Sequence, residues 1–189
     1  CVDVTYTVYP DGTVRMEMDY EPVEGLPEMP EFGFIFKLDA DYENLRWYGL
    51  GPDETYADRK RGGKLGIYTN RVSDNMARYL VPQECGNKED VRYMCVTDDE
   101  GNGLIFKSRH MCAQALPHSP HELENAAHAY ELGPVHYTYV KTSLAQMGVG
   151  GDDSWGAKVH PEYLLDVRNP LHFDMNFKGV SARHPGYQI

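Results

Sequence analysis

Ten residues toward the end of the chain, 146–155, hold side chains suited to binding a flat ligand. Their sequence, Gln-Met-Gly-Val-Gly-Gly-Asp-Asp-Ser-Trp, includes three glycines, two carboxylates and one of the two tryptophans of the 189-residue chain. Glycine permits positive φ and close backbone approach, so we expect this segment to fold as a sharp loop. A rigid indole on such a loop is suited to stacking on a ligand face. The segment therefore suggests recognition of something like a sugar ring.

The other polar features of this segment have simpler interpretations. Asp152 and Asp153 could be metal ligands or catalytic carboxylates, but adjacent aspartates in a glycine-rich loop more often accept hydrogen bonds from their own turn, and we favour this reading. Residues 148–151 could be mistaken for a phosphate-binding loop. They lack the strand–loop–helix frame and the following Lys-Ser/Thr, which argues against nucleotide binding.

Histidines and cysteines in the middle of the chain invite a metal-site hypothesis. No Cys-x-x-Cys or His-Glu-x-x-His pattern organises them, so we expect surface or packing histidines, free thiols and no metal ligand. No nucleophile elbow suggests Ser-His-Asp catalysis either. The residues considered are His110, His118, His121 and His128, with Cys1, Cys85, Cys95 and Cys112.

Alternation of apolar and polar residues predicts an all-β chain. Val2, Val4, Tyr6 and Val8 alternate with polar residues, and a turn at 10–12 precedes a second alternating run at 14–18, which predicts a β-hairpin. Many short strands separated by Gly/Pro/Asp-rich turns indicate an antiparallel β-sandwich. Further strands are expected at 32–38, 44–48, 63–70, 91–97, 103–108, 136–144, 162–167 and 172–177.

One short helix is expected at about 120–127. Ser119 at the N-cap, Pro120 at N1 and Glu122 at N3 form a capping box. No second helix has comparable signals. We expect one β-sandwich domain over residues 1–180 and a weakly ordered tail at 181–189.

Composition excludes several classes of protein. The formal charge of −11, from 29 acidic against 18 basic residues, disfavours nucleic-acid binding. We find no run of 18 apolar residues and no signal-peptide pattern, so we expect no membrane partner. The chain begins with Cys1 inside a strand pattern and reads as a piece of a longer polypeptide. Its localisation, cytoplasmic or periplasmic, would depend on a signal in the missing part.

Three segments resemble a known family. They are 47–60 (Trp-Tyr-Gly-Leu-Gly-Pro-Asp-Glu-Thr-Tyr-Ala-Asp-Arg-Lys), 82–92 (Pro-Gln-Glu-Cys-Gly-Asn-Lys-Glu-Asp-Val-Arg) and 146–155. In this order they resemble the C-terminal small-chain domain, domain 5, of the large bacterial β-galactosidases, the family 2 glycoside hydrolases. The resemblance extends from Val2 to about Phe177. One departure is Cys85, which stands where the family usually has asparagine.

The resemblance implies a fold and a site. The fold would be the antiparallel two-sheet β-supersandwich shared with galactose mutarotases. Trp155 would reach into the active site as a platform under the sugar, with Asp153 and Ser154 as further candidate substrate-binding residues. Trp47, on an alternating strand, keeps the interpretation of a core aromatic. The first two motifs would maintain the architecture of the domain, with Arg59, Lys60 and Arg92 in ordinary ion pairs.

The resemblance also implies that catalysis lies elsewhere. The family keeps its paired glutamates on a (β/α)₈ barrel, so we expect no catalytic residue in this chain and an inactive isolated fragment. The parent enzyme would be a retaining hydrolase of terminal β-D-galactosides such as lactose. It would be a homo-oligomer, with its magnesium and sodium bound largely by other domains and no cofactor in this chain. Partners would be the galactoside and the remaining parent domains. Two alternatives remain: a free-standing carbohydrate-binding module and a mutarotase-like sugar epimerase, although fold alone does not license the latter.

Overall fold

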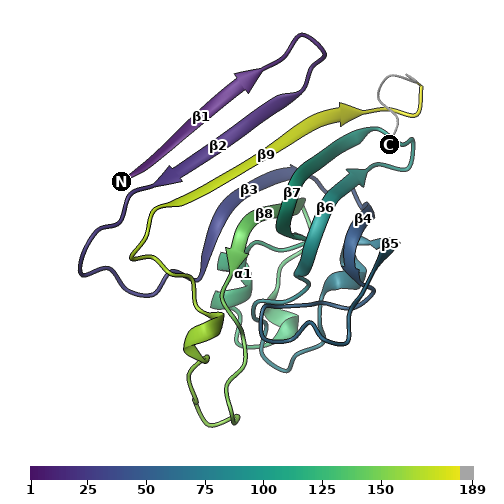
Figure 1. The fold of residues 1–189 in the computed structure, drawn as a ribbon. Helices are drawn as coiled ribbons and strands as arrows, with labels where there is room; N and C mark the ends of the chain where they lie inside the picture. Colours follow the sequence, from purple (N-terminus) through teal and green to yellow (C-terminus); the bar gives the residue numbers. More distant parts are fainter. Residues whose placement is uncertain (184–189) are drawn as a thin grey trace.

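Strands dominate residues 1–183, which are the part of the chain that the computed structural model describes (Figure 1). The nine strands there are all paired antiparallel, as the alternation predicted. Their bounds are β1 (Val2–Val8), β2 (Val14–Tyr20), β3 (Glu31–Asp39), β4 (Asn44–Gly51), β5 (Lys64–Arg71), β6 (Lys88–Thr97), β7 (Gly103–Leu116), β8 (Tyr137–Gln146) and β9 (Leu171–Val180). Short helices are α1 (Pro120–Asn125) and the 3₁₀ turns η1 (Val72–Asn75), η2 (Ala129–Glu131) and η3 (Pro161–Tyr163).

The long strand β7 organises the sheet. Seven strands follow the order β1-β2-β9-β7-β6-β4-β5, and the pair β3–β8 branches from the second half of β7. Gly103 to Lys107 of β7 pair with β9, whereas Cys112 to Leu116 pair with β8. The described strands therefore form one branched, connected sheet (Figure 1). The two-sheet supersandwich and the mutarotase-like topology are not confirmed.

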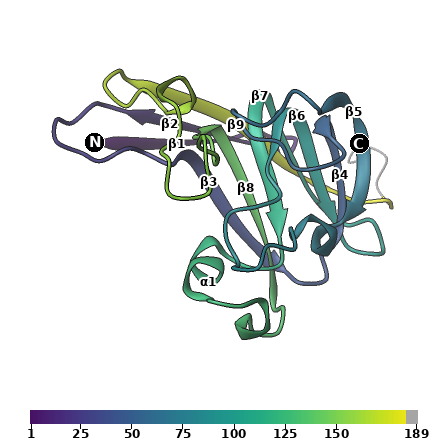
Figure 2. The same cartoon turned by 90° about the horizontal axis from the view of Figure 1, so that it is seen from below.

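The sheet curls so that β3 packs across β9 and β7. The ring of Phe34 lies 5.8 Å from that of Phe173, and the ring of Phe36 lies 4.9 Å from that of Phe106. Figure 2 shows this curl, with α1 near the ends of β3 and β8. One apolar cluster fills the enclosed face because every strand from β2 onward except β5 contributes a buried residue to it; its members include Met16, Tyr20, Leu45, Trp47, Met94, Val140 and Met175.

Most of the predicted elements are confirmed, with two strand corrections. The strand expected at 162–167 is wrong: Pro161 opens the turn η3, and Leu165 and Val167 pack against the core from an irregular segment. The strand expected at 103–108 continues to Leu116. Its last six residues are buried on both faces, so they show no alternation that could be read from the sequence.

The predicted helix is present but ends at Asn125 rather than at 127. Its capping box forms as expected, since Glu122 N donates to Ser119 Oγ at 3.1 Å and Ser119 N donates to Glu122 Oε2 at 2.7 Å. Asn125 Nδ2 donates to the His121 carbonyl at 2.7 Å, and Ala126 is already extended. The three 3₁₀ turns had not been predicted.

The C-terminal tail is described only in part. Ser181 Oγ donates to Asn102 Oδ1 at 2.9 Å, and Arg183 pairs with Glu100 at 3.1 Å. The rest of the predicted tail, 184–189, lies outside the described residues. Across residues 1–183, no helix has the length and apolar character needed to span a membrane.

Candidate functional site

A loop of residues 147–160 leaves the end of β8 and projects from the sheet before η3 (Figure 1). Its tip carries Trp155, whose side chain is 93% exposed. Ser154 and Asp153 beside it are exposed as well. A tryptophan displayed in this way contributes nothing to the core of the described chain, and the core interpretation therefore fits Trp47 and not Trp155.

The glycines of this loop permit close packing. A Cβ on Gly148 would lie 2.6 Å from Asp58 Oδ2, and a Cβ on Gly151 would lie 2.2 Å from the Ala157 carbonyl oxygen. Neither distance is possible for a real side chain. Glycines 148, 150 and 151 do not use the positive φ that they permit, whereas Gly156 does, at +100°. Close approach, and not left-handed backbone, is what these two glycines provide.

The two adjacent aspartates have different partners. Asp153 Oδ1 accepts hydrogen bonds from Trp155 N at 2.8 Å and Ala157 N at 3.3 Å, so the predicted turn role is confirmed for this residue. Asp152 Oδ1 instead lies 2.8 Å from His160 Nε2. This hydrogen bond and the attraction of the carboxylate raise the pKa of His160 above 6.5. Hydrogen bonds that Asp152 and Asp153 form with other residues of the loop therefore stabilise its conformation.

The base of the loop is fixed to the rest of the domain. Met147 N donates to the Pro30 carbonyl at 2.8 Å and Gly148 N donates to the Tyr163 carbonyl at 2.9 Å. Gly150 N donates to Asp58 Oδ2 at 2.7 Å. Sequence reasoning missed Asp58 as a site residue, and its place in the first motif was the only available signal.

A polar cavity of about 430 Å³ lies at the base of the loop. Carboxylates, a guanidinium and an imidazole line it, and such groups can hydrogen-bond the hydroxyls of a polyol. These groups suit binding of a polar, sugar-like ligand, although Trp155 is not among the residues that line the cavity. The lining residues are Asp58, Arg59, Val149, Gly150, Gly151, Asp152, His160, Glu162 and Tyr163.

The acids of the other two motifs hold the architecture together. Glu54 accepts hydrogen bonds from Gly86 N at 2.6 Å and from Arg59, which pairs with it at 2.5 Å. Glu84 accepts from Tyr56 Oη at 3.1 Å and from the buried Lys141 at 3.0 Å, and Lys141 also pairs with Glu31 at 2.8 Å. These contacts join the loops 51–56 and 82–87 to β8, which agrees with the structural role that we expected.

The remaining cations and thiols are engaged locally. Lys60 pairs with Glu89 at 3.2 Å, and Arg92 donates to the Asp90 carbonyl. Cys85 packs beside Leu116 and Leu123, and burial raises the pKa of its thiol to about 11, so it is a poor nucleophile. All four cysteines are free, as expected.

The candidate metal ligands are scattered over the part of the chain that the structure describes. Among residues 1–183, no group of three or more His, Cys, Asp or Glu side chains is placed to hold a metal ion. His118 is 3.9 Å from Glu122 and His128 is 3.2 Å from Glu131, each within its own turn.

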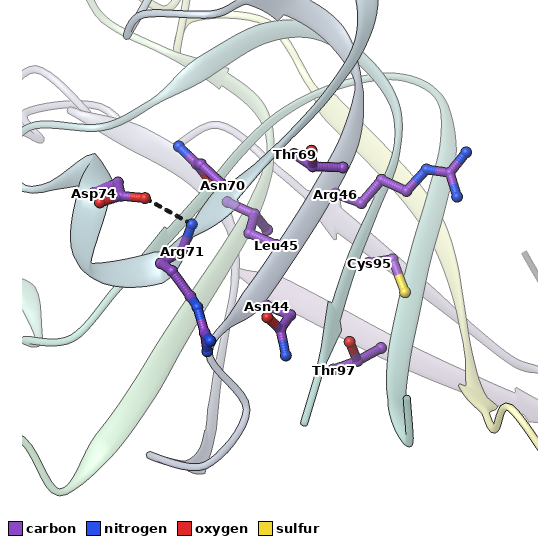
Figure 3. Close-up of a pocket in the computed structure, with 9 residues that line it drawn as sticks. All are labelled: Asn44, Leu45, Arg46, Thr69, Asn70, Arg71, Asp74, Cys95 and Thr97. Atoms are coloured by element: carbon purple, nitrogen blue, oxygen red, sulfur yellow. Dashed lines mark hydrogen bonds between the residues drawn. The ribbon is translucent and has the colours of Figure 1, made fainter. Parts of the chain in front are cut away.

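A second depression, of about 470 Å³, lies over β4, β5 and β6 (Figure 3). Several of its polar groups are already hydrogen-bonded: Arg71 N donates to Asp74 Oδ2 at 2.9 Å, and Arg71 and Asn44 both donate to Oδ1 of Asp99, which lies outside the lining, at 3.2 and 2.9 Å. Neither depression is lined by Trp155, and the loop is the stronger candidate because it carries that exposed indole itself. Its lining comprises Asn44, Leu45, Arg46, Thr69, Asn70, Arg71, Asp74, Cys95 and Thr97.

A family model and several known proteins are similar to this chain. The family model described as Beta galactosidase small chain matches residues 1–177. A β-galactosidase of Halalkalibacterium halodurans is 48% identical over 184 residues, which are 95% of this chain and 18% of the relative. One of Priestia megaterium is 47% identical over 163 residues, covering 86% of this chain and 16% of the relative.

A separate subunit is also similar. The β-galactosidase small subunit of Latilactobacillus sakei is 35% identical over 185 residues, covering 92% of this chain and 58% of that subunit. This chain thus spans less than a fifth of the two larger relatives and more than half of the small subunit. The motifs, the all-β structure and these matches show that the chain belongs to the β-galactosidase small-chain family.

Proposed function

We propose that this chain is the small-chain part of a β-galactosidase that hydrolyses terminal β-D-galactosides such as lactose. It would complete the substrate pocket of a catalytic (β/α)₈ barrel supplied by the rest of the enzyme. Membership of the family supports this proposal. The relatives suggest two arrangements, a domain within one long polypeptide or a separate small subunit. In the first arrangement, the complete enzyme would be a homo-oligomer.

The proposal rests on the exposure of Trp155. Its indole is 93% exposed on a loop that is braced at its tip by Asp153 and at its base by Asp58. An exposed tryptophan held this firmly is suited to present a flat apolar face to a pyranose. Asp153 would act through the loop and Ser154 from beside the indole.

The chain would contribute binding, and the chemistry would lie elsewhere. Retaining hydrolysis needs two carboxyl groups about 5–5.5 Å apart, one as nucleophile and one as acid/base, and the family places them on the barrel. We therefore expect the purified chain alone not to hydrolyse a chromogenic galactoside above background. Addition of the remaining polypeptide should restore turnover. Activity of the chain alone that disappears when one of its own acids is mutated would overturn this division of labour.

The outer face of β1 offers a surface for the remaining polypeptide. Val2, Val4, Tyr6 and Val8 share one face of the strand and are 43–73% exposed. Within the described residues β1 pairs with β2 alone, so its outer edge is open. An open edge with an apolar face is typical of a strand that another segment covers. Tyr6→Asp should therefore weaken association with the rest of the enzyme, measured by co-purification.

The decisive experiment changes Trp155 in the complete enzyme. Trp155→Ala should raise KM and weaken binding of glucose-type acceptors by about 1–3 kcal/mol, whereas Trp155→Phe should retain part of the platform. Tyr130→Ala removes another aromatic, 81% exposed, and serves as the matched control. Unchanged KM in Trp155→Ala would refute the proposed role of this residue.

Two further measurements separate the alternatives. Calorimetric titration of the purified chain with galactose and lactose would reveal a free-standing binding module if affinity persisted without the rest of the enzyme. Polarimetry would detect sugar epimerisation by the chain alone. We expect neither activity.

A further inference from the structure

We propose that Asp58 positions the Trp155 loop and is thereby a positioning residue for ligand binding. Asp58 lies 92 residues before Gly150 and belongs to a different motif, yet its carboxylate enters the base of the loop. The role in ligand binding rests on the function proposed above for Trp155. The structural part, that Asp58 orders the loop, stands independently of it.

Asp58 projects from a rigid turn. Tyr56 and Arg59 form an isolated antiparallel bridge around it, with Arg59 N donating to the Tyr56 carbonyl at 2.8 Å. The Tyr56 side chain is fully buried, and its hydroxyl donates to Glu84 at 3.1 Å. Asp58 therefore presents its carboxylate from a fixed point of the core.

The loop is shaped to receive this carboxylate. Oδ2 accepts the Gly150 N–H at 2.7 Å, a short, charge-assisted distance. The same oxygen occupies the space where a Cβ on Gly148 would lie, at 2.6 Å, with Asp58 Cγ at 2.7 Å. Two loop residues therefore adapt to one side chain. This complementarity is specific to an acceptor at position 58.

The carboxylate occupies this place at an energetic cost. Asp58 Oδ1 is buried and, within residues 1–183, accepts no hydrogen bond. Burial of a polar atom without a partner is unfavourable, and such atoms call for an explanation. Holding the loop in place is such an explanation. Gly150 lies five residues before Trp155, and the close approach of Gly151 to Ala157 brings together the two ends of the segment that carries the indole. Displacement of Gly150 would tilt the indole.

The test uses the complete enzyme with Asp58→Ala, Asp58→Asn and the control Asp41→Ala, which removes an exposed aspartate from the turn between β3 and β4. Hydrogen exchange of peptides covering 147–157 reports on the loop, and KM and kcat report on binding and chemistry. Asp58→Ala should accelerate exchange of the loop about tenfold or more and raise KM about fivefold with little change in kcat. Asp58→Asn, whose amide oxygen can still accept from Gly150 N, should restore much of both.

A double-mutant cycle makes the test independent of general destabilisation. Gly148→Ala should loosen the loop in the wild-type background because its Cβ displaces the carboxylate. In the Asp58→Ala background that space is empty, so the added effect of Gly148→Ala should be smaller. Additive effects, or unchanged loop exchange in Asp58→Ala, would overturn the positioning role. A loosened loop with unchanged KM in both Asp58→Ala and Trp155→Ala would instead refute the ligand-binding role of Trp155 while leaving the loop-ordering role of Asp58 intact.

Discussion

The two tryptophans of the chain occupy opposite environments. Trp47 on β4 is 1% exposed, stacks on Tyr68 at 5.3 Å and donates its indole N–H to the Leu50 carbonyl at 3.0 Å. Trp155 is 93% exposed at the tip of a loop. The same side chain thus supplies apolar contact inside the fold in one case and displays it to the outside in the other. The difference lies in what surrounds each indole and not in the residue itself.

The largest expected difference between them is in stability. Trp47→Ala should lower the free energy of unfolding by about 3–5 kcal/mol because it opens a cavity in the core and removes a satisfied hydrogen bond. Trp155→Ala should change it by less than about 0.5 kcal/mol. Urea denaturation of both variants measures the difference. Comparable losses of unfolding free energy in the two variants would show that both tryptophans stabilise the fold equally.

A buried lysine beside Trp47 should make stability depend on pH. Lys88 Nζ lies 4.9 Å from the Trp47 ring, and burial lowers its pKa from 10.5 to about 8. Between pH 8 and 10.5 the unfolded chain holds more protons at this site than the folded chain, so the contribution of Lys88 to stability rises with pH through that window. The full change is about 3 kcal/mol. Lys88→Met should remove this rise when the free energy of unfolding of the wild type and of the variant is measured by denaturation across the window. The same dependence on pH in both proteins would contradict the prediction.

A glycine near each tryptophan sharpens the contrast further. A Cβ on Gly49 would lie 2.8 Å from Val91 Cγ2 and 3.0 Å from Val91 Cα inside the core, so Gly49→Ala should cost about 1–3 kcal/mol of global stability. Gly151→Ala also creates a clash, with the Ala157 carbonyl, but at the neck of an exposed loop. Thermal denaturation should detect the first substitution clearly and the second weakly. Hydrogen exchange in 147–157 should show the reverse order of effects.

The smallest expected effect concerns the titration of His160 beside the loop. Its hydrogen bond to Asp152 raises its pKa in the folded chain, so the stabilisation of the pair is complete below pH 6.5 and is lost as pH rises through the raised value. NMR titration of the imidazole should show a pKa above 6.5, and Asp152→Asn should return it toward that value. A pKa unaffected by this substitution would show that the pair does not form in solution.

The sequence predicted the local features of the fold best. Alternation located the hairpin β1–β2, and the capping box located α1, because both signals lie within a few consecutive residues. The second half of β7 escaped because burial on both faces removes alternation. The irregular segment after Pro161 escaped because its apolar residues imitate a strand while packing without a partner strand.

The candidate site was predictable only in part. Glycines, aspartates and an indole within ten residues identified the loop, and the structure places that indole outside the core. The contact between Asp58 and Gly150 could not be inferred, since it joins residues 92 positions apart and depends on how two motifs meet in space. Contacts of this kind follow from tertiary packing and leave no periodic signal in the sequence.

Within residues 1–183, each end of the seven-strand path is an unpaired strand edge, and unpaired edges favour self-association. β1 is the strand at one end and β5 is the strand at the other, where Leu65 and Ile67 are 50% and 57% exposed. Two different unpaired edges can join head to tail, and such contacts do not close into a ring unless their rotation happens to do so. At high concentration, the described part of the chain expressed by itself should therefore associate head to tail. A segment that pairs with the free edge of β1 would block this contact and keep the protein monodisperse.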